Sequence, residues 1–166
     1  MSATAALIHE FDQEAKTTRR VLERVPSDKL AWKPHAKSMS LGQLAQHVAT
    51  VPGFITSWAL QDSVVFAGEG GPELKSTAEV LAAHDQSAVQ AKDALSKIGD
   101  AGLGAMWAMK TPDGKTVMSM PKGALIRSVA LNHLYHHRGQ LSVYRRLLDV
   151  PVPSIYGPSA DERPGG

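Results

Sequence analysis

Four segments of this 166-residue chain repeat an apolar residue every three or four positions, the pattern of a helix with one buried face. The segments lie near residues 3–25, 41–58, 77–98 and 122–148. Each segment ends at residues that favour turns or helix caps. Four amphipathic helices in a chain of this length predict an all-α fold, a four-helix bundle in which the apolar faces meet. We expect a single domain over residues 1–166.

The second and third helices have defined starting points. Ser40 with Gln43, and Ser76 with Glu79, match the capping box, in which the hydroxyl and the side chain three residues later satisfy exposed backbone N–H groups. Pro52 lies inside the second segment, where it removes one helical hydrogen bond. We therefore expect a kink in the second helix at this proline.

Three regions lack helical periodicity. Residues 106–110 and 115–120 are short apolar runs on either side of a Thr-Pro-Asp-Gly turn sequence, which predicts a small β-hairpin between the third and fourth helices. Glycines and a proline within residues 68–72 predict a loop. Residues 151–166 contain several prolines and glycines and are expected to form an extended tail packed on the bundle.

The composition excludes several classes of protein. The chain has no cysteine, so disulfides, iron–sulfur clusters, thiolate zinc sites and cysteine nucleophiles are excluded. The net charge is 18 − 16 = +2 and the basic residues are scattered, so we do not expect nucleic-acid binding. The first residues do not match a signal peptide, and no apolar run approaches the ~20 residues that span a bilayer. We expect a cytoplasmic protein that does not enter a membrane.

Three of the seven histidines lie at inward-facing helix positions. His133 and His137 are four residues apart, so on a helix their directions differ by about 40°. Both share a stripe with apolar residues, and His47 replaces an apolar residue on the second helix. A single inward histidine is usually an ordinary core residue, whereas two buried neutral rings need two polar partners. The spacing alone leaves both a metal site and ordinary packing open.

Other side chains near this pattern have two interpretations each. His136 lies off the stripe and is either an edge residue or a partner of the metal-binding rings. Gln140 either orients His137 or packs along its helix, and Arg138 pairs either with an acidic ligand or with a carboxylate on the helix surface. Four aromatic residues are candidate pocket walls or plain core: Trp58, Trp107, Tyr144 and Tyr156. Three histidines are expected at surface or packing positions: His9, His35 and His84.

Two motifs resemble signatures of the DinB-like (DinB/YfiT-like) superfamily. Residues 30–34, Leu-Ala-Trp-Lys-Pro, and 40–48, Ser-Leu-Gly-Gln-Leu-Ala-Gln-His-Val, are similar to its second-helix signature. Residues 132–141, Asn-His-Leu-Tyr-His-His-Arg-Gly-Gln-Leu, are similar to its last-helix signature, and residues 152–159 resemble its usual tail. The motifs occur in the family's order, and the resemblance covers most of the chain.

This resemblance implies an up-down-down-up four-helix bundle, often a homodimer, that holds one divalent ion with three histidines. The matching positions in this chain are His47, His133 and His137. Members of the family include thiol-cofactor-dependent S-transferases and a mycothiol-dependent maleylpyruvate isomerase.

Three neutral imidazoles would leave a divalent ion at least one open coordination position, the pattern of catalytic rather than structural zinc. Such a position can acidify water or bind a thiol as thiolate. We therefore expect a metal-dependent transferase or hydrolase of a small molecule, in first place a transferase that uses a low-molecular-weight thiol. Zinc is the first choice of ion and nickel the second. The alternative is a non-catalytic, metal-binding homodimer that serves in a stress response or as an interaction module.

Overall fold

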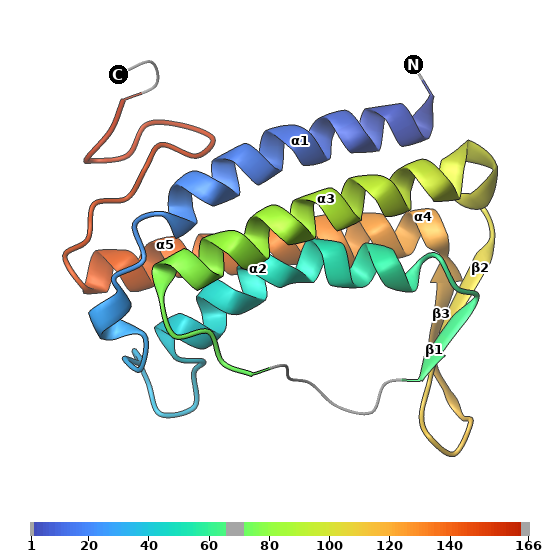
Figure 1. Ribbon diagram of the computed structural model, residues 1–166, viewed down its shortest axis with the longest axis horizontal. Coiled ribbons are helices and arrows are strands. Elements are labelled where there is room, and N and C mark those ends of the chain that lie inside the picture. The colour runs from blue at the N-terminus through green and yellow to red at the C-terminus, as the bar shows by residue number, and fades with distance from the viewer. Residues whose placement is uncertain (1, 66–71, 164–166) are drawn as a thin grey trace.

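The computed structural model describes residues 2–65 and 72–163. This part of the chain is mostly helical, and a small three-stranded sheet lies at one end of the helices (Figure 1). Of the loop predicted at residues 68–72, only Pro72 falls within the described residues.

The four long helices are α1 (Ala3–Leu22), α2 (Leu41–Trp58), α3 (Thr77–Gly102) and α5 (His133–Leu147). In Figure 1, α1 and α5 run away from the sheet, whereas α2 and α3 run toward it. Their apolar faces meet in two clusters of buried side chains. One cluster includes Phe11, Leu95 and Trp107 at the sheet end, and the other includes Leu44 and Leu141 at the opposite end. A short 3₁₀ turn, η1 (Ser27–Lys29), follows α1.

Both predicted capping sites begin helices. The Gln43 amide donates to Ser40 Oγ (3.1 Å) and the Ser40 amide donates to Gln43 Oε1 (2.9 Å), so the capping box is complete. At α3, the Glu79 amide donates to Ser76 Oγ (3.2 Å), but the Glu79 carboxylate accepts from the Lys75 amide instead (2.9 Å). The hydroxyl half of the second box is confirmed, and its carboxylate half bonds one residue earlier than predicted.

Helix α2 continues through Pro52, and a side chain of α3 bonds to the backbone on either side of this proline. Ser87 Oγ accepts a hydrogen bond from the Gly53 amide (2.8 Å) and donates to the Thr50 carbonyl (3.2 Å). A Cβ atom added to Gly53 would lie 2.8 Å from both Ser87 Oγ and the Ser87 carbonyl oxygen. Glycine at position 53 therefore permits the close approach of α2 and α3.

The predicted fourth helix is divided into three parts. It begins as α4 (Lys122–Leu125), continues as the π-helical segment η2 (Ile126–Asn132), and becomes α5 at His133. Hydrogen bonds in a π-helix span five residues instead of four. The buried pair Leu125 and Ile126 is accordingly followed by the buried pair Ala130 and Leu131, five positions later. The expectation of one regular α-helix was wrong over these seven residues.

The predicted hairpin is present as β2 (Met106–Lys110) and β3 (Thr116–Pro121), paired antiparallel. Gly114 occupies the turn with φ 87°, a conformation that favours glycine. A third strand, β1 (Ser63–Val65), pairs parallel with β2 and was not predicted. Trp107 of β2 is fully buried and stacks on Trp58 of α2, with ring centroids 6.0 Å apart. The sheet thus contacts the helices through an aromatic pair.

The described part of the tail, residues 151–163, is attached to α1 and to the end of α5 by ion pairs. Glu162 accepts from Arg20 at 2.6 Å, and Asp161 accepts from Arg146 at 2.5 Å. Arg138 of α5 also donates to the Tyr156 hydroxyl, at 2.5 Å. These contacts connect the tail to both helices.

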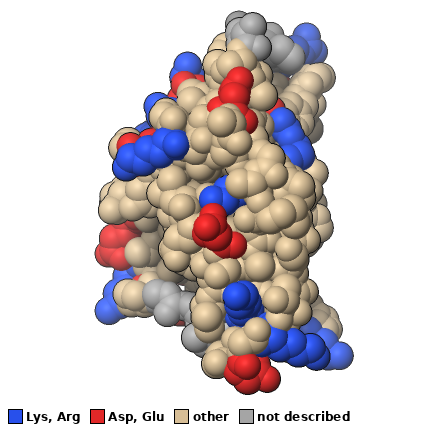
Figure 2. All heavy atoms as spheres, turned by 90° about the vertical axis from the view of Figure 1, so that its right-hand side faces the viewer, with Lys and Arg blue, Asp and Glu red and all other residues tan. Residues whose placement is uncertain are grey.

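The surface carries charges of both signs. Figure 2 shows the sheet end, where basic and acidic side chains are interspersed among uncharged ones. No helix in the described part of the chain combines the length and the apolar character needed to cross a bilayer.

Candidate metal centre

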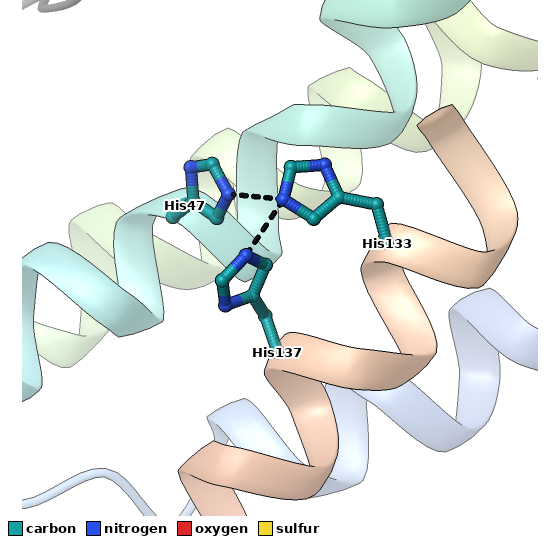
Figure 3. Close-up of side chains that lie close together, drawn as sticks. All are labelled: His47, His133 and His137. Carbon is teal, nitrogen blue, oxygen red and sulfur yellow. Dashed lines mark hydrogen bonds between the residues drawn. The ribbon is translucent and has the colours of Figure 1, made fainter. Parts of the chain in front are cut away.

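The fold brings together three histidines from two helices. His47 lies in the middle of α2, His133 is the first residue of α5, and His137 follows one turn later. All three rings point toward one another (Figure 3), and each residue is partly buried. Residues 47 and 133 are 86 positions apart in the sequence, so the packing of α2 against α5 creates this group.

The same nitrogen of each ring faces the centre of the group. His133 Nε2 lies 3.3 Å from His47 Nε2 and 2.6 Å from His137 Nε2, and one ligand atom of each residue lies within 4.8 Å of the others. Zinc–nitrogen bonds of about 2.0–2.1 Å in a tetrahedral site place two ligand nitrogens about 3.3 Å apart. The pair formed by His47 and His133 already has this spacing, and the pair formed by His133 and His137 would have to widen. The three residues could hold a metal ion.

His47 is held in the neutral form that metal binding requires. Burial, and to a smaller extent the neighbouring His137 and His133 rings, lowers the pKa of its imidazole to about 4. The ring is therefore uncharged near neutral pH, with a lone pair available for a ligand bond.

Gln140 orients the His137 ring. The Nδ1–H group of His137 donates to Gln140 Oε1 at 2.7 Å. This bond places the ring proton on Nδ1, so Nε2 carries the lone pair that faces His133 and His47. Metal-binding histidines usually have such a partner for the second nitrogen. Of the two interpretations of Gln140, the geometry supports the orienting one.

Arg138 points away from the histidines. Its side chain is 1% exposed and pairs with Glu14 of α1 at 2.6 Å. It also donates to Thr18 Oγ1 at 3.0 Å, and its guanidinium lies 5.1 Å from the centre of the Tyr156 ring. The ion-pair interpretation is thus the right one, although the pair is buried rather than on the surface.

The remaining candidates are spread over the molecule. Trp58 and Trp107 belong to the sheet-end cluster, and Tyr156 contacts Arg138 from the tail. His84 is buried between α3 and α1, where its Nε2–H donates to the Ala15 carbonyl at 3.0 Å. The other two histidines expected at surface or packing positions, His9 and His35, are exposed. His136 is exposed as well, and its ring centroid lies 4.9 Å from that of His137.

A small cleft of about 190 Å³ adjoins the three-histidine group. It is lined by Ser38, Met39, Leu44, His137, Gln140 and Tyr144. Tyr144 was a candidate pocket wall, whereas Ser38, Met39 and Leu44 were not singled out. Ser38 and Met39 lie in the connector before α2, which has no periodicity to indicate which side chains turn inward. The only indication in the sequence is that Ser38 and Met39 lie between the two motifs at residues 30–34 and 40–48.

Comparisons with known proteins agree with this fold. The uncharacterized protein YrdA of Bacillus subtilis (strain 168) is 27% identical over 158 residues, which cover 93% of this chain and 89% of YrdA. A DinB-like protein of Bacillus cereus superposes with a TM-score of 0.72 at 23% identity, covering 90% of this chain and 95% of that one. The DinB-like protein YjoA of Bacillus subtilis superposes with a TM-score of 0.70 at 18% identity, covering 95% and 99%. At these identities the two structures support the fold alone.

The family itself is established by sequence. The sequence pattern of the DinB family matches residues 1–164, which is nearly the whole chain. The match includes both histidine-bearing helices, α2 and α5, and therefore the three-histidine group that could hold a metal ion. This chain belongs to the DinB family.

Proposed function

We propose that this protein is a divalent-metal-dependent enzyme that acts on a small molecule, in first place a transferase that uses a low-molecular-weight thiol. The observation that carries the proposal is the convergence of His47, His133 and His137 beside a cleft. The group contains three histidines and no carboxylate among the residues that the structure describes. Three protein ligands leave room for a further ligand, whereas structural zinc sites are usually closed by four.

The roles of the residues follow from their positions. His47, His133 and His137 would hold the ion through Nε2, and Gln140 would keep His137 in the required orientation. A divalent ion at such a site supplies a Lewis acid that lowers the pKa of a bound water or thiol. Because the chain has no cysteine, the sulfur of any thiol chemistry must come from a separate molecule. Zinc is the first choice of ion, and nickel is the second.

The proposal extends to the arrangement of the whole protein. We assign the helices to the up-down-down-up four-helix bundle that the family resemblance implies, which is supported by the opposite directions of α1 and α5 relative to α2 and α3 (Figure 1). We also propose a cytoplasmic homodimer that binds neither membranes nor nucleic acid. Light scattering on purified protein tests the dimer.

Turnover tests the enzymatic function. Zinc-loaded and nickel-loaded protein should form mass-detectable conjugates between a low-molecular-weight thiol and an electrophilic small molecule. His137→Ala should abolish conjugate formation, while His9→Ala, which changes an exposed histidine, should not. Metal binding without turnover for any thiol would contradict an enzyme. It would favour the alternative, a non-catalytic metal-binding homodimer that serves in a stress response or as an interaction module. In such a protein, removing the metal with a chelator should shift the melting temperature or the dimerisation equilibrium.

A further inference from the structure

The cleft beside the three-histidine group is lined by His137, which belongs to that group, and by five residues with apolar or neutral polar side chains. Met39 and Leu44 contribute apolar surface, Tyr144 contributes an aromatic ring, and Ser38 and Gln140 contribute neutral polar groups. None of the lining residues is lysine, arginine, aspartate or glutamate. A charged group placed among these side chains would lose hydration without gaining an ion-pair partner, which is costly.

The wall of the cleft is fixed by contacts from two directions. The Tyr144 hydroxyl donates to the Met39 carbonyl at 3.3 Å, which connects α5 to the connector before α2. The Trp32 ring packs edge-on against the Tyr144 ring, with centroids 5.6 Å apart at an interplanar angle of 83°. Leu44 is buried beneath this wall, whereas Met39 is exposed at the rim. A ligand would therefore meet a largely preformed surface.

The size of the cleft limits what it can hold. Its volume is about 190 Å³. Complete small-molecule pockets usually measure ~300–1,000 Å³. At ~30 Å³ for each water-sized group, the cleft has room for roughly six heavy atoms. It therefore suits one arm of a ligand, such as a phenyl ring or a short alkyl chain, rather than a whole ligand.

We propose that this cleft binds the uncharged, apolar arm of a small molecule whose other end reaches the three-histidine group. Met39 and Tyr144 are the residues that select this arm. His137 connects the two parts of the site, because it belongs both to the histidine group and to the lining of the cleft. This inference rests on the proposed function, which supplies the metal ion that would bind the other end of the ligand.

Three thiols that share the sulfur but differ in the attached arm test this selectivity. Phenylmethanethiol carries an apolar arm, 2-mercaptoethanesulfonate an anionic arm and thiocholine a cationic arm, and neither charged group is a zinc ligand. By calorimetry on zinc-loaded protein, phenylmethanethiol should bind at least about tenfold more tightly than either charged thiol. Equal affinities for the three thiols would overturn the proposal.

Two exposed apolar residues provide a matched pair of variants. Met39→Glu places a carboxylate at the rim of the cleft, and Val143→Glu places one on an exposed position of α5 outside the lining. We expect Met39→Glu to weaken phenylmethanethiol binding about tenfold. Val143→Glu and the conservative Met39→Leu should leave it unchanged. Equal losses in Met39→Glu and Val143→Glu would overturn the proposal.

A second measurement does not depend on the metal. In metal-free protein with ¹³C-labelled methionine methyl groups, phenylmethanol should shift the NMR signal of Met39 at concentrations that leave the signals of Met106 and Met118, which lie outside the lining, unchanged. An unaffected Met39 signal would contradict ligand binding in the cleft, even if the protein binds zinc. If the protein binds no metal but the Met39 signal shifts, the proposed function fails and the binding cleft stands.

Discussion

The hydrogen bond between His137 and Gln140 controls which nitrogen of the ring faces the other two histidines. Without the 2.7 Å contact to Gln140 Oε1, the His137 ring could rotate or carry its proton on Nε2. We predict that Gln140→Ala lowers the zinc affinity about 10–100-fold, the usual effect of losing such a partner. Competition with a chromophoric chelator measures the change.

The control for this prediction is Gln13→Ala, which removes an exposed glutamine of α1. This variant should bind zinc as the unaltered protein does. If Gln140→Ala also retains full affinity, Gln140 does not orient the ring and its bond to His137 is incidental.

His84 makes the stability of the fold depend on pH. Its side chain is buried, its Nδ1 atom has no hydrogen-bond partner, and burial holds its pKa below the ordinary 6.5. Below pH 6.5 the unfolded chain therefore takes up a proton that the folded protein resists, so the free energy of unfolding falls as the pH falls. The charged neighbours Asp85 and Arg19 act in opposite directions on this pKa.

We predict that His84→Gln, which keeps a donor for the Ala15 carbonyl, reduces the loss of stability on acidification. Urea unfolding of metal-free protein at several pH values between 7 and 5 measures the slope of the free energy of unfolding against pH. The exposed His9→Gln variant should retain the slope of the unaltered protein. Identical slopes for the two variants would show that His84 does not titrate as its burial implies.

The contact between α2 and α3 depends on one hydroxyl group. Ser87 satisfies the Gly53 amide and the Thr50 carbonyl beside Pro52, and Gly53 is buried. We predict that Ser87→Ala lowers the free energy of unfolding by ~1–3 kcal/mol, because buried backbone groups lose their partner. Urea denaturation provides the measurement. Ser96→Ala, which removes an exposed hydroxyl bonded within its own helix, is the control, and an equal effect of both variants would contradict the prediction.

Local sequence patterns predict the helix starts correctly but do not predict the irregular elements. The hydroxyl caps at Ser40 and Ser76 depend on residues three positions away, so they are readable from the sequence. The π-helical segment depends on how its side chains pack in the core, and the apolar periodicity of the sequence does not distinguish it from an α-helix. Strand β1 has only three residues, too few to show alternation, and exists because β2 lies beside it.

Arg138 connects α5, α1 and the tail through one buried side chain. It pairs with Glu14 and contacts Tyr156, and its own side chain is 1% exposed. We predict that Arg138→Met lowers the free energy of unfolding by ~3–5 kcal/mol, because the partly buried Glu14 carboxylate loses its cationic partner and keeps only the hydrogen bond from the Tyr156 hydroxyl. The double variant Glu14→Gln/Arg138→Met should recover part of this loss. Chemical denaturation checks both, and an unchanged stability of the single variant would contradict the assignment.

The three-histidine group illustrates what a sequence can and cannot predict about a site. Helical spacing placed His133 and His137 on one face and His47 at an inward position of the second helix, and the family resemblance implied that the three hold one ion. The meeting of the three rings depends on how α2 and α5 pack, which only the folded structure shows. The walls of the cleft come partly from an aperiodic connector, so Met39 could not be identified from its position in the sequence.

The metal content of the purified protein tests the account most directly. Protein prepared without a histidine tag and dialysed against excess zinc or nickel should retain about one ion per chain by elemental analysis, as expected for one three-histidine site. His137→Ala should retain none while its circular dichroism remains helical. No retained zinc or nickel in the unaltered protein, or equal retention in His137→Ala, would contradict the assignment of this group as a metal site.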